Sequence, residues 1–124
     1  MNDLIYNIDP PGDIDPKFLG RLQELGGAKL ASELVGMYLT RGGQLLETIS
    51  ANMGTKNFSE VKNAAHSLIS SAGNLGGRQV SDLAKQIENA IIDENTELLP
   101  ELLSQLKSAH AEFHQYLNEA LEKL

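Results

Sequence analysis

The sequence predicts an all-α protein: an antiparallel four-helix bundle with a short additional helix at its N-terminal end. Apolar residues recur every three or four positions through most of the 124 residues, which is the spacing of amphipathic helices. The chain has no tryptophan and only three phenylalanines and three tyrosines, so aliphatic side chains must build its core. That composition favours packed helices over a β-sandwich. Short connections between the helical segments favour antiparallel neighbours.

Residues 1–12 are predicted to form a flexible arm, and residues 13–124 a single helical domain. The run Asp9-Pro10-Pro11-Gly12 cannot continue a helix. Asp15-Pro16 is typical of a helix start, because an acidic cap and a proline in the first turn both favour one. A short apolar stripe follows and ends at Gly26-Gly27. It consists of Phe18, Leu19, Leu22 and Leu25.

A long helix is predicted over residues 28–51, and Gly42-Gly43 in its middle is a weak point at which it could kink or break. The next predicted helix covers residues 59–75. Asn57 or Ser59 would cap its start, and Gly76-Gly77 would end it. Two more helices are predicted over residues 78–92 and 97–124. The last one alternates apolar spacings of four and three, as bundle helices do. Its positions are Leu99, Leu103, Leu106, His110, Phe113, Leu117, Ala120 and Leu124.

The stretch from Ala64 to Gly77 places one histidine, His66, among small residues. The apolar stripe around it consists of Val61, Ala65, Leu68, Ala72 and Leu75. At about 100° per residue, His66 lies roughly 130° from the centre of this stripe and should face solvent. Gly73 lies on the same face. A glycine inside a helix costs roughly 1 kcal/mol against alanine, so its presence suggests close approach by another protein.

The run that begins at His66 resembles the histidine phosphotransfer (HPt) domain. The matching positions are His66, Leu68, Ser70, Ser71, Ala72, Leu75 and Gly76. A second run is similar to the next helix of that family, and it consists of Val80, Leu83, Ala84, Ile87 and Glu88. The resemblance extends from about Asp15 to the C-terminus, although only the His66 segment is specific. The family usually carries a lysine three residues after the histidine, where this chain has Ile69.

The resemblance implies a protein of a two-component phosphorelay. His66 would accept a phosphoryl group from the aspartyl phosphate of one receiver domain and pass it to another. A solvent-facing imidazole can act as a nucleophile toward phosphorus. The implied partners are receiver domains of response regulators or a hybrid sensor histidine kinase, and the receiver would supply the metal ion. The chain would carry a phosphohistidine intermediate, and would not turn over substrate as an independent enzyme.

Five further residues are candidates for the site. Lys62 lies one turn before His66 and could replace the missing lysine as a phosphate-stabilising cation. The partner-binding residues are predicted to be an apolar anchor and three small residues that leave room for a partner. These are Ile69, Ser70, Gly73 and Gly77.

Ten Lys and Arg against 17 Asp and Glu give a net charge of −7, which argues against nucleic acid and weakly against an anionic membrane as partners. The chain lacks cysteine, an apolar run of membrane-spanning length and a signal-peptide pattern. We therefore expect a cytoplasmic monomer. The Met1 start and the short arm favour a free-standing protein.

We expect neither a metal nor another cofactor in this chain. His110 and His114 have the i, i+4 spacing that can bind zinc. However, His110 falls on the apolar seam of the last helix, so it is expected to be packed in the core.

Two other functions remain open. A degenerate HPt-like module could bind receiver domains without carrying phosphate, and Ile69 in place of lysine is the feature that favours it. A structural bundle could instead oligomerise through Ile69 or through the last helix.

Overall fold

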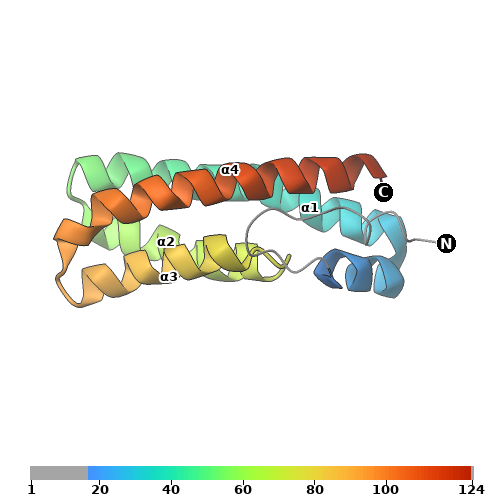
Figure 1. The fold of residues 1–124 in the computed structure, drawn as a ribbon, viewed down its shortest axis with the longest axis horizontal. Helices are drawn as coiled ribbons and strands as arrows, with labels where there is room; N and C mark the ends of the chain where they lie inside the picture. Colours follow the sequence, from blue (N-terminus) through green and yellow to red (C-terminus); the bar gives the residue numbers. More distant parts are fainter. Residues whose placement is uncertain (1–16, 124) are drawn as a thin grey trace.

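The computed structural model describes residues 17–123, so the predicted arm, the helix start at Asp15-Pro16 and Leu124 lie outside the described residues. The elements are α1 (Lys17–Gly54), α2 (Phe58–Gly73), α3 (Arg78–Ile92), a 3-10 turn η1 (Thr96–Leu98) and α4 (Leu99–Lys123) (Figure 1). The described residues contain no strand. The predicted all-α bundle is confirmed.

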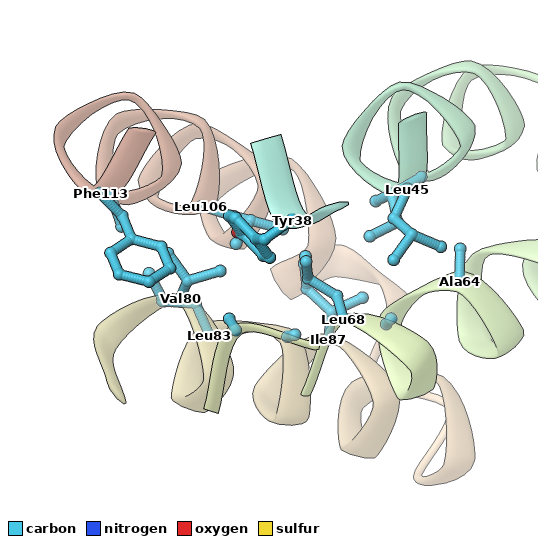
Figure 2. Packing of buried hydrophobic residues seen from close by; sticks show 14 of the residues in the cluster. Tyr38, Leu45, Ala64, Leu68, Val80, Leu83, Ile87, Leu106 and Phe113 are labelled. Atoms are coloured by element: carbon cyan, nitrogen blue, oxygen red, sulfur yellow. The ribbon is translucent and has the colours of Figure 1, made fainter. Parts of the chain in front are cut away.

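Each long helix packs against two others. Helix α1 contacts α2 and α4, and α3 also contacts α2 and α4. The short connections make helices that follow each other in sequence run antiparallel (Figure 1). The apolar stripes of all four helices meet in one core, in which Tyr38, Leu68 and Leu106 lie close to one another (Figure 2).

Helix α1 consists of two helical segments that meet at Gly27. This glycine has φ 76° and ψ −176°, a conformation that other residues rarely adopt. The first segment, dark blue in Figure 1, therefore runs back in the opposite direction to the segment that follows. The predicted end of a short helix at Gly26-Gly27 is confirmed.

The backbone stays helical through Gly42-Gly43, so the kink considered for this pair is wrong. Gly42 is buried, and a Cβ atom there would lie 2.6 Å from the ring of Tyr38. The Tyr38 hydroxyl oxygen in turn lies 3.2 Å from Nδ1 of His110, with which it shares a hydrogen bond. His110 is only 8% exposed, which confirms its place in the core. Burial lowers the pKa of His110, and nearby His114 lowers it further.

The three connections between long helices share one hydrogen-bond pattern. After α2, Gly76 has φ 82°, and the amide of Gly77 donates to the carbonyl of Ala72 at 2.9 Å. This is the Schellman arrangement, and it confirms the predicted stop at Gly76-Gly77. In the turn after α1, the residue equivalent to Gly76 is Lys56, and in the turn after α3 it is Glu94. Both have φ 60°.

Replacing Lys56 or Glu94 with glycine is expected to raise the free energy of unfolding by about 1 kcal/mol each, because only glycine adopts this conformation without a steric cost. Urea unfolding of each variant measures the effect. Lys107→Gly, an exposed position inside α4, is the matched control and should lower stability by about 1 kcal/mol. If both turn variants are less stable than the wild type, these two residues carry no backbone strain.

No helix within residues 17–123 combines the length and the apolar character needed to cross a bilayer. In the same part of the chain, no three His, Cys, Asp or Glu side chains gather where they could hold a metal ion.

Candidate functional site

Helix α2 buries one face and exposes His66 on the other. Its fully buried side chains are Val61, Ala65, Leu68 and Ala72. The side chain of His66 is 74% exposed. The prediction that this imidazole faces solvent is therefore confirmed, and the ring can be reached by another protein.

Glu88 of α3 forms a hydrogen bond with the His66 ring. Its Oε2 lies 2.8 Å from Nδ1 of His66, while the Glu88 side chain itself is only 19% exposed. A carboxylate accepts hydrogen bonds, so this contact places a hydrogen on Nδ1. In the neutral imidazole the lone pair is then on Nε2. Glu88 is part of the run that resembles the next helix of the family, but its contact with His66 was not predicted from the sequence.

Helices α2 and α3 approach closely just beyond His66. The Ser81 hydroxyl donates to the carbonyl of Ile69 at 2.8 Å, which joins the two helices. A Cβ atom on Gly73 would lie 3.4 Å from Ser81 Oγ. That distance is an ordinary van der Waals contact, so packing between these helices does not by itself require glycine at this position, and the room for a partner that the sequence suggested stays a prediction.

The other predicted residues around His66 differ in exposure. Ser70 is exposed, and its hydroxyl donates to the carbonyl of Ser67 at 3.4 Å. Lys62 and Ile69 are half-buried, and Ile69 packs against the edge of the core. Ile69 therefore offers a partner only part of its side chain.

Gly77 is buried, which corrects its predicted place on the partner-binding face. A Cβ atom at this position would lie 2.6 Å from the ring of Phe113 in α4. Glycine is required here because the α2–α3 turn lies directly on a core aromatic ring. We leave Gly77 out of the proposed docking surface.

An apolar groove of about 600 Å³ lies between the two segments of α1 and the C-terminal end of α2. It is lined by Phe18, Arg21, Leu22, Leu25, Leu34, Met37, Tyr38, Arg41, Ser71, Asn74 and Leu75. Leu25 is 82% exposed and Met37 66%, although both are large apolar side chains. This groove could not be predicted from the sequence, because it depends on how the first segment of α1 folds back at Gly27.

Comparison with protein families gives independent evidence of the family to which this chain belongs. The model of the Hpt domain matches residues 33–122, which is most of the chain and includes all of α2 and α3. The chain belongs to the Hpt domain family. Comparisons with curated proteins and with solved structures find no match.

Family membership confirms the resemblance that the His66 motif indicated. An Hpt domain has a phosphotransfer function in two-component systems and interacts with receiver domains. The match begins at residue 33, whereas Phe18, Arg21, Leu22 and Leu25 precede it. One wall of the groove therefore lies outside the part of this Hpt domain that the family model covers.

Proposed function

We propose that His66 accepts a phosphoryl group from the aspartyl phosphate of a receiver domain and donates it to the aspartate of another receiver. The observation that carries this proposal is an exposed imidazole whose Nδ1 is bound to Glu88. Nε2 then presents its lone pair to solvent. The protein would be an intermediate carrier in a relay.

The chemistry follows from this geometry. The Nε2 lone pair forms a bond to phosphorus while the bond between phosphorus and the aspartyl oxygen breaks, and the electron pair leaves with the carboxylate. The imidazole gains positive charge during the step, and the Glu88 carboxylate stabilises that charge through the Nδ1 hydrogen. The reverse step, toward a second aspartate, uses the same arrangement.

Incubation with a phosphorylated receiver domain tests the proposal. The wild-type chain should take up an acid-labile, base-stable phosphoryl group. The alternative function, a docking module without phosphate, predicts binding of the receiver with no label on the chain. Ile69, where the family usually has lysine, is the residue that favours this alternative.

Glu88→Ala is expected to slow phosphoryl transfer by about fivefold or less, because a hydrogen-bonded ion pair with one exposed partner contributes about 1 kcal/mol. Nitrogen-15 NMR should also show the hydrogen of the neutral His66 ring redistributing from Nδ1 to Nε2. A general effect on α3 would not cause that change. Asp82→Ala, at an exposed position on the same helix, is the control. Unchanged nitrogen shifts in Glu88→Ala would contradict the assigned role.

Lys62 is proposed to compensate in part for the absent lysine. A phosphohistidine carries negative charge, which an adjacent cation stabilises by about 1 kcal/mol or less at an exposed site. Lys62→Ala should therefore lower the equilibrium fraction of phosphorylated His66, and Ile69→Lys should raise it, each by at most about fivefold. Quantitative phosphate transfer at fixed receiver concentration measures both. If neither variant changes the fraction, local charge does not set phosphate retention.

The proposed docking surface surrounds His66 and includes Ile69, Ser70 and Gly73. Small side chains there allow a partner to approach the imidazole, and the exposed part of Ile69 offers an apolar contact. We further propose that the protein acts as a cytoplasmic monomer. Its mass in solution and its distribution on cell fractionation are the corresponding measurements.

A further inference from the structure

The apolar groove beside α2 exposes large apolar side chains to solvent, which is uncommon on the surface of a monomeric domain. Leu25 and Met37 are the two most exposed large apolar residues in the part of the chain that the structure describes. Exposed apolar surface in a concave site marks a place where another apolar segment binds. The proposed phosphotransfer site does not use these two residues.

The charges of the groove are opposite in sign to those of the whole chain. The charged residues among those that line it are Arg21 and Arg41, although the net charge of the protein is −7. The two arginines belong to the two different segments of α1, and the guanidinium of Arg21 lies 4.9 Å from the centre of the Phe18 ring. An occupant of the groove should therefore combine apolar side chains with carboxylates.

The sequence that precedes α1 has this composition. Residues 1–16 contain four aspartates and no lysine or arginine. The aspartates are Asp3, Asp9, Asp13 and Asp15, and the apolar side chains gather at Leu4, Ile5, Tyr6 and Ile8. The segment joins the described chain at Lys17, next to Phe18 in the groove lining. The last of these apolar residues, Ile8, lies nine residues before Lys17 and can therefore reach up to about 30 Å from it.

We propose that residues 1–16 bind this groove, with the apolar side chains of residues 4–8 in its interior and the aspartates near Arg21 and Arg41. Because the segment is part of the same chain, its effective concentration at the groove is in the millimolar range. Individually weak apolar contacts are then sufficient for occupancy. This inference concerns a surface apart from His66, so it does not depend on the proposed phosphotransfer.

The methionine methyl groups give a direct test in the full chain, without receiver or phosphate. Met37 lines the groove, whereas Met53 lies near the end of α1 and outside the groove lining. The variant Leu4→Ser/Ile5→Ser/Ile8→Ser is expected to move the carbon-13 methyl resonance of Met37 and to leave that of Met53 in place. Arg41→Gln should move the Met37 resonance in the same direction, and the wild-type position should not depend on protein concentration.

The matched control is Ile92→Ser/Leu98→Ser, which removes exposed apolar side chains elsewhere on the molecule and should leave the Met37 resonance unchanged. A Met37 resonance that is identical in the wild type and in the triple variant would overturn the proposal. A wild-type resonance that moves with protein concentration would also overturn it, because the occupant would then be a second copy of the chain.

Discussion

Replacement of His66 with glutamine is expected to abolish phosphorylation of the protein by a phosphorylated receiver domain. The glutamine amide keeps polar atoms near Glu88, but its nitrogen has no available lone pair to attack phosphorus. The loss should be complete, because the proposal places the phosphoryl group on one atom. Since the His66 side chain is 74% exposed and its hydrogen bond is to Glu88, the free energy of unfolding should fall by about 1 kcal/mol or less.

His114→Gln is the matched control for this experiment. His114 is a second partly exposed histidine, and its Nδ1 lies 3.1 Å from the amide nitrogen of Asn118. Uptake of the acid-labile label should be unchanged in this variant. Label that persists in His66→Gln would show that another residue is the acceptor and would refute the assignment of His66.

Gly42→Ala and Gly43→Ala are expected to change stability in opposite directions, although the two positions are adjacent in one helix. An added Cβ on Gly42 would lie 2.6 Å from the ring of Tyr38. That ring is 3% exposed and hydrogen-bonded to His110, so it has little freedom to move away. Overpacking of this kind costs about 1–3 kcal/mol. A Cβ on Gly43 meets nothing within 4 Å, and alanine should stabilise the helix by about 1 kcal/mol there.

Chemical unfolding in urea should therefore separate the two variants by about 1–3 kcal/mol, the cost of overpacking, because the gain in helix propensity is common to both. Each variant serves as the control for the other, because both replace one glycine in α1 with the same residue. Equal stabilities would contradict the close approach between Gly42 and Tyr38. In the background of Tyr38→Leu, Gly42→Ala should cost less stability than it does in the wild type, since the clash is with the aromatic ring.

The helices could be predicted from the sequence because apolar residues repeat with the period of the helix that buries them. The break at Gly27 was also accessible, since an apolar stripe ends there. Gly42-Gly43 shows the limit of that reasoning. A glycine that breaks a helix and a glycine that makes room for a neighbouring ring look the same in one sequence.

The candidate site could be predicted only where it depends on one helix. The exposure of His66 follows from the periodicity of α2 alone. Its contact with Glu88 depends on the rotation and register of α3 against α2, and the apolar residues of each helix do not specify these. The burial of Gly77 under Phe113 likewise depends on where α4 crosses the turn.

The Ser81–Ile69 hydrogen bond and the His66–Glu88 contact both belong to the hairpin formed by α2 and α3. The groove, in contrast, takes most of its lining from α1. The reactive imidazole and the groove are thus built on different stretches of one polypeptide. Substitutions that remodel the first segment of α1 should change what the groove can hold while the geometry around the imidazole stays intact. The N-terminal region could therefore diverge in sequence, or be engineered, without rebuilding the reactive centre.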